Sequence, residues 1–155
     1  MAWLVASALL EVSCMKPIAL VGRILFALLF IVAALGHFKP DTVAYAAASG
    51  VPLANLLVPA SGLLAIAGAL SVATGYRARW GAAALVAFLV PVTLTMHKFW
   101  AVSDPMMAQL QQIMFMKNVS LIGAALYFVH AGAGAFSLDA LRARSRKPEL
   151  AAAGS

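Results

Sequence analysis

Residues 17–36 read PIALVGRILFALLFIVAALG, twenty residues in which Arg23 is the single charge. A helix that crosses about 30 Å of hydrocarbon needs roughly 20 mostly apolar residues. This stretch therefore predicts a membrane-spanning helix, and it decides the class of fold for the whole chain.

Three more stretches of the same character follow, at about 52–74, 78–97 and 105–131. The composition agrees, because 64% of the 155 residues are hydrophobic and only 10% are charged. A soluble domain has about a quarter of its residues charged. We predict an all-α fold, a four-helix transmembrane bundle in a bacterial inner membrane, surrounded by the lipid bilayer.

The chain is expected to divide into three parts. Residues 1–15 form an N-terminal extension, and MKPIALVGRILF from Met15 looks like a more natural start. Residues 16–140 form the four-span membrane domain, and residues 141–155 form a basic, disordered cytoplasmic tail. The lone Cys14 supplies neither a disulfide nor a redox pair nor a metal-ligand set, so no metal site is predicted.

Positive charge gathers on one side of the predicted bundle. Eight lysines and arginines flank the N-terminal side, the turn between spans two and three, and the tail, whereas Lys39 and Lys98 lie on the other side. Short loops rich in Lys and Arg stay cytoplasmic, so both termini are expected in the cytoplasm. The basic residues form short clusters without interleaved aromatic residues, which excludes nucleic acid as a partner.

The chain also carries signals for helix ends and for close packing. Asp41 is expected to cap a short interfacial helix that stops at Gly50, and Pro52 suits the first turn of the next span. The sequence SDP at 103–105 predicts a capped start for the fourth span. Small residues predict close contact between spans: Ser61, Gly62, Ala65, Gly68, Ala69, Ala82–Ala84 and Gly123–Ala125.

Polar residues gather where three spans reach the outer side. The fourth span enters through AQLQQIMFMKN, in which Lys117 lies about five residues inside Gln112, or some 7–8 Å at 1.5 Å per residue. Gln111, Phe115 and Asn118 share one helix face, with Lys117 beside it. On the third span, Thr93, His97 and Trp100 are expected to align in the same way.

These residues have two interpretations. Interfacial lysines commonly extend toward water, and Trp and His are common at the interface without a specific role; Arg23, Lys39, Lys98 and Trp100 fit this description. A lysine inside a span favours function, because at a helix centre it costs about 2.5–3.5 kcal/mol. We therefore predict one outward-facing polar pocket, with these ligand-binding candidates: Lys117, Asn118, Gln111, Gln112, His97, Trp100, Phe115 and His37.

Several segments together resemble the DoxX family of small membrane proteins. They are GRILFALLFIVAALGHF, GVP, GALSVATGYRARWGAAAL, HKFW, QQIMFMKNVSLIGAAL and SLDA, which together cover about residues 16–140. The resemblance implies a four-helix inner-membrane protein associated with a quinone-linked oxidoreductase. Members often carry an acidic residue midway in the second span, where this chain has Ala65 or a neighbour, which disfavours a mechanism that needs a membrane-embedded carboxylate.

Three functions stay open at this point. In the first, the protein is an accessory or oxidoreductase subunit of a redox system, with a quinone held by Lys117, Asn118, Gln112 and His97 and stacked on Phe115 or Trp100. In the second, it is a non-catalytic scaffold or stress-response partner of soluble proteins. In the third, it handles a small solute or lipid, for which tightly packed spans leave little room. An autonomous enzyme is not expected. Redox partner proteins and a homo-oligomer stay open.

Overall fold

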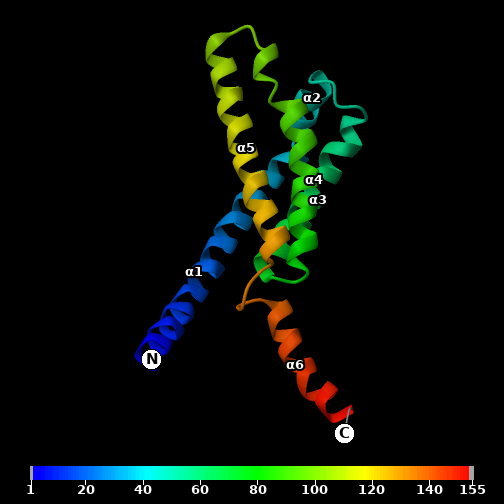
Figure 1. The fold of residues 1–155 in the computed structure, drawn as a ribbon. Helices are drawn as coiled ribbons and strands as arrows, with labels where there is room; N and C mark the ends of the chain where they lie inside the picture. The colour runs from blue at the N-terminus through cyan, green and yellow to red at the C-terminus, as the bar shows by residue number, and fades with distance from the viewer. Residues whose placement is uncertain (1, 154–155) are drawn as a thin grey trace.

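The computed structural model describes residues 2–153, with side chains for residues 17–145 (Figure 1). No strand occurs in the described range. The helices are α1 (Ala2–Leu35), α2 (Pro40–Ala48), α3 (Ala54–Thr74), α4 (Ala78–Met96), α5 (Pro105–Ala131) and α6 (Leu138–Ala153), with 3-10 turns η1 (Gly36–Phe38) and η2 (Phe99–Ala101). Four segments are long and apolar enough to cross a membrane: Pro17–Phe38, Ala54–Thr74, Ala78–Ala101 and Pro105–Ala131. The predicted four-helix class is confirmed.

The four long helices pack as a chain of neighbours. Helix α3 packs against both α1 and α4, and α4 packs against α5. Helix α1 leans away from α5, and the two described ends of the chain lie at the same end of the bundle (Figure 1). We call this the α6 end and the opposite one the α2 end.

Small residues allow the central helices to approach closely. A Cβ atom on Gly68 of α3 would lie 2.9 Å from the carbonyl oxygen of Gly81 in α4. Ala65 and Ala69 are fully buried beside this contact. The predicted small-residue contacts of the second span are therefore confirmed. Gly123 of α5 differs, because a Cβ there would meet nothing within 4 Å.

The helix starts match the sequence signals in part. The carboxylate of Asp104 accepts a hydrogen bond from the backbone N–H of Met107 at 2.8 Å, and Pro105 begins α5. Helix α2 forms and ends near Gly50 as predicted, but Asp41 does not cap it. Its N-cap is Lys39, because Pro40 takes the first helical position and has no N–H to satisfy.

Helix α6 replaces the disordered tail that the basic composition suggests. Its first turn is anchored to the loop between α3 and α4. The N–H of Asp139 donates to the carbonyl of Gly75 at 3.1 Å, and the Asp139 carboxylate accepts from the N–H of Arg77 at 3.0 Å. These two bonds fix where α6 begins, and they could not be read from composition.

Arg23 does not extend toward water as the sequence suggests. Its side chain is only 2% exposed. The guanidinium donates to the carbonyl of Ala73 at 3.2 Å, to that of Phe136 at 2.7 Å and to that of Ala133. Arg23 thus joins α1 to the end of α3 and to the α5–α6 connection, using three of the five N–H donors of its guanidinium group.

Candidate functional site

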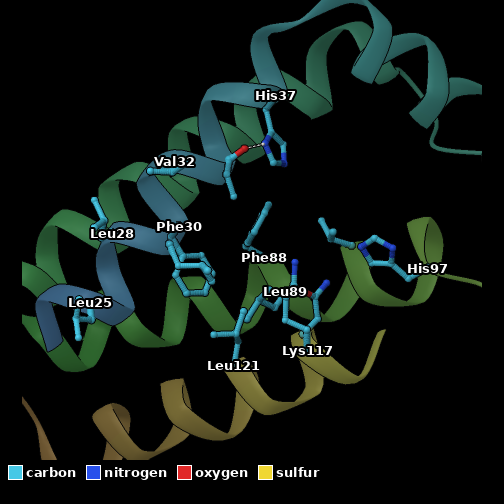
Figure 2. Close-up of a pocket in the computed structure, with 14 residues that line it drawn as sticks. Leu25, Leu28, Phe30, Val32, His37, Phe88, Leu89, His97, Lys117 and Leu121 are labelled. Carbon is cyan, nitrogen blue, oxygen red and sulfur yellow. Dashed lines mark hydrogen bonds between the residues drawn. The ribbon is translucent and has the colours of Figure 1, made fainter. Parts of the chain in front are cut away.

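A cavity of about 530 Å³ lies between α1, α4 and α5. Ligand pockets in proteins usually measure about 300–1,000 Å³, so this one has room for a small molecule. Figure 2 shows lining side chains from the three helices around a common space. The lining residues are Leu25, Leu28, Leu29, Phe30, Val32, Ala33, His37, Phe88, Leu89, Val92, His97, Lys117, Asn118 and Leu121.

The cavity is apolar along most of its length and opens toward the side of the bundle. On α1, Leu25 and Val32 are each 61% exposed although they line it. They stay exposed because α1 packs on α3 and leaves the gap toward α5 unfilled. In a bilayer this opening faces lipid, so a molecule dissolved in the membrane can reach the cavity.

The polar end of the cavity lies toward the α2 end. Four of the predicted site residues line it there: His37, His97, Lys117 and Asn118. They come from η1, the end of α4 and the middle of α5. The structure therefore brings together half of the predicted set.

Lys117 is the charged group of this end. Its Nζ atom donates only to the thioether of Met114, at 3.5 Å, and sulfur is a weak acceptor. Among the described residues no carboxylate pairs with it. The sequence predicts that Asn118, Gln111 or Gln112, His97 and backbone carbonyls near Pro91 hold this lysine. Instead its ammonium group lines the cavity, and its one hydrogen bond is to Met114.

Asn118 is the buried neighbour of Lys117, with 5% of its surface exposed. No hydrogen bond to its side chain is found within the described part of the chain. Every fully enclosed side-chain N or O atom in that part of the chain has a hydrogen-bond partner, so the amide atoms of Asn118 are not fully enclosed. The amide therefore reaches the open space of the cavity, and it can both donate to and accept from a bound molecule.

A hydrogen-bond chain braces the polar end across three elements. His97 Nδ1 lies 2.7 Å from Gln111 Oε1, and Gln111 Nε2 donates to the hydroxyl of Tyr45 at 3.0 Å. With the Gln111 amide in this orientation, its oxygen accepts, and Nδ1 of His97 is the donor. This chain joins the end of α4 to α5 and α2, so Gln111 positions His97 and does not itself line the cavity.

His37 is held by a glycine contact and a ring contact. A Cβ on Gly62 would lie 2.8 Å from the Cβ of His37. The His37 ring lies 5.5 Å from the ring of Phe88, and its Nδ1 is 3.4 Å from the carbonyl oxygen of Ala33. Because Gly62 has no side chain, the side chain of His37 can pack directly against α3.

The other predicted site residues lie outside the cavity lining. Trp100 and Phe115 pack edge to face at 5.9 Å, and both contact Phe99. Gln112 is exposed on α5. The expected alignment of Thr93, His97 and Trp100 along one helix is wrong. Helix α4 ends at Met96, and Trp100 belongs to η2.

Sequence reasoning missed the α1 wall of the cavity. The third hypothesis was ranked low because tightly packed spans should leave no room, and the cavity removes that objection. The apolar face of α1 gave no signal, because a helix that is hydrophobic all round does not indicate which side meets protein and which meets lipid. Among the described residues, no group of three or more His, Cys, Asp or Glu could hold a metal ion.

Comparison with known proteins gives the following matches. Residues 11–144 match the SURF4 family. Inner membrane protein YqjF of Escherichia coli (strain K12) is 32% identical over 124 residues, which cover 79% of this chain and 89% of the relative. Inner membrane protein YphA of the same organism is 28% identical over 127 residues, covering 80% and 90%.

A further relative, matched over a shorter stretch, is the Surfeit locus protein 4 homolog of Schizosaccharomyces pombe (strain 972 / ATCC 24843). It is 29% identical over 92 residues, which cover 59% of this chain and 30% of that protein. No solved structure matches the chain. The matching family is distinct from the DoxX family that the sequence segments resemble. What the two families share is that their members are small membrane proteins.

Proposed function

The chain belongs to the SURF4 family, and we propose that this integral inner-membrane protein binds a membrane-dissolved amphiphile. The binding site is the cavity between α1, α4 and α5, which a lipid-like molecule enters from the side. The two bacterial relatives, named as inner membrane proteins, support the location. The role is binding or handling of the molecule, without a catalytic step.

The observation that carries this proposal is Lys117, which is the single Lys, Arg, Asp or Glu in the lining of a largely apolar cavity. A lysine in a membrane span is costly unless it is paired or hydrated, and among the described side chains this one has only a thioether as partner. An apolar tail would fill the space beside Leu25, Leu28 and Leu121. An acidic head group would then pair with the ammonium and accept a bond from Asn118. We infer a ligand with an anionic head and one apolar tail.

Thermal unfolding of the purified protein in detergent tests the proposal, with oleate as the probe. A ligand at 100 times its dissociation constant stabilises the folded state by about 2.7 kcal/mol. We expect oleate to raise the unfolding temperature of the wild type and to lose this effect in Lys117→Met. Lys39→Met is the matched control, because Lys39 is exposed at the same end and does not line the cavity. Equal stabilisation of both variants would contradict the proposal.

A quinone is the second candidate ligand, as the accessory of a redox system would need. The observation in its favour is the pair of aromatic rings, His37 and Phe88, beside the amide of Asn118. A quinone head is neutral and depends on hydrogen bonds to its carbonyl oxygens. Asn118→Leu should therefore abolish stabilisation by a short-chain quinone and keep most of that by oleate. If neither amphiphile stabilises the wild type, the scaffold hypothesis replaces both.

We also propose that both termini lie in the cytoplasm. Arg77, Arg79, Arg142 and Arg144 belong to the α6 end, and positive charge in short loops stays inside. Reporter fusions after Ser155 should then read cytoplasmic, and fusions near Ala47 in α2 should read external. An external signal from the fusion at Ser155 would reverse this orientation, and the cavity would then open in the other leaflet.

A further inference from the structure

We propose a second binding site, at the α6 end, for the anionic head group of a phospholipid. A separate cavity of about 420 Å³ lies between the start of α4 and the connection from α5 to α6. Its lining includes Arg77, Arg79, Trp80, Gly132 and Asp139. None of these residues lines the cavity at the α2 end.

The arginines give this cavity its chemistry. Arg79 reaches across it from α4, since a Cβ on Gly132 would lie 3.4 Å from the Nε atom of Arg79. Within the described part of the chain, the side chains of Arg77 and Arg79 make no hydrogen bond; Arg77 lies 5.8 Å from the ring centroid of Tyr76. Guanidinium groups match the geometry of phosphate oxygens and bind them in pairs of bonds.

The acidic residue of the cavity does not cancel this charge. The Asp139 carboxylate accepts from the N–H of Arg77 at 3.0 Å and so occupies the positive N-terminal end of α4. Arg142 adds a further cation nearby, 4.4 Å above the ring of Tyr76. Two arginines and one carboxylate line the cavity, with Arg142 as a further cation nearby, so the net charge favours an anion.

Position selects a lipid over a free anion. The membrane-crossing segment Ala78–Ala101 begins at this cavity, and the segment Pro105–Ala131 ends at it. Trp80 is 77% exposed and Tyr127 is 66% exposed on the same two helices, and such aromatic residues lie at the head-group level of a bilayer. A phosphate held here carries acyl chains that can run along α4 and α5. Basic pockets between spans bind lipid head groups in this way.

Native mass spectrometry of the purified protein tests the site, with phosphatidylglycerol and phosphatidylcholine of identical acyl chains. We expect the anionic lipid to bind more tightly to the wild type. One arginine near a membrane surface contributes about fivefold to affinity, so Arg79→Gln should weaken phosphatidylglycerol binding about fivefold. Arg144→Gln, a charge on α6 outside the cavity lining, should change it little. Lys117→Met should leave phosphatidylglycerol binding at the α6 end intact and remove only binding at the α2 end.

Three results would overturn the proposal. Equal affinity for phosphatidylglycerol and phosphatidylcholine would mean that the site does not recognise an anionic head group. An equal loss of phosphatidylglycerol affinity in Arg79→Gln and Arg144→Gln would indicate general attraction by positive charge and not a specific site. Displacement of phosphatidylglycerol by inorganic phosphate at similar concentration would identify a site for the free anion. Both arginines are exposed, so the variants should fold and each result can be measured.

Discussion

Arg23 and Lys117 both lie within membrane-crossing segments, and their surroundings are opposite. Arg23 is 2% exposed and donates to three backbone carbonyls at the α6 end. Lys117 lines an open cavity toward the α2 end and has a single weak partner. A buried cation bonded to several backbone carbonyls holds a structure together, whereas one that faces a cavity with a single weak partner can hold a ligand. The predictions below break or sharpen this contrast.

The largest effect is expected for Arg23. Arg23→Met leaves the carbonyls of Ala73, Ala133 and Phe136 without their donor, and each unsatisfied buried group costs about 1–3 kcal/mol. We expect the free energy of unfolding to fall by at least about 3 kcal/mol, measured by thermal or denaturant unfolding in detergent. Arg23→Lys keeps the charge but cannot reach three acceptors, so it should recover only part of the loss. An unchanged stability for Arg23→Met would end the structural interpretation.

A smaller loss is expected at the contact between α3 and α4. A Cβ on Gly81 would collide with the side chain of Ser71, and such overpacking costs about 1–3 kcal/mol. Gly81→Ala should therefore destabilise the bundle by this amount. Gly123→Ala is the matched control, because space there is open and alanine favours a helix by about 1 kcal/mol over glycine. If both substitutions act alike, close helix contact is not what selects glycine at Gly81.

The contrast also shows what the sequence can and cannot predict. Windows of about twenty apolar residues predicted four spans, and the cap at Asp104 was predicted because its signals are local. Arg23 was misjudged because its acceptors lie 50, 110 and 113 residues away and belong to the backbone, which carries no residue-specific signal. Lys117 and Asn118 were predicted as a polar pair, but their division into an open and a buried member depends on where α4 lies.

The polar end of the cavity was predicted, but its apolar part and its α1 wall could not be, for a related reason. It exists because α1 packs on α3 and leaves a gap toward α5, and Leu25 or Val32 would look the same in either arrangement. Hydrophobic spans have no solvent contrast to orient them. By comparison, the brace between His97 and Gln111 was within reach, because both were assigned to one polar end.

The two cations should respond differently to substitution by methionine: Arg23→Met should lower the free energy of unfolding, and Lys117→Met should not. Without ligand, Lys117→Met should leave the free energy of unfolding unchanged or raise it by up to about 1 kcal/mol, because it removes a poorly paired charge from the span. Unfolding of the ligand-free variant in detergent measures this, with Lys39→Met as the control for a lost surface charge. A fall comparable to that of Arg23→Met would make Lys117 a structural residue and remove the basis for ligand binding.

The smallest effect concerns Tyr76, outside the spans at the α6 end. A hydrogen bond from Arg142, with the nearby charges of Arg77 and Arg142, holds the pKa of the Tyr76 hydroxyl below its ordinary value of 10.0. A depressed pKa stabilises the fold only where the tyrosine is ionised, at alkaline pH, and this contribution disappears as the pH falls through the lowered pKa. At neutral pH, Tyr76→Phe should therefore leave stability nearly unchanged.

Ultraviolet titration should show one tyrosine ionising early in the wild type, and Tyr76→Phe should remove that step. Arg142→Gln should raise its pKa toward the ordinary value, and added salt should do the same in part, because exposed charges are screened. Titration unaffected by Arg142→Gln would mean that α6 does not lie against the α3–α4 loop.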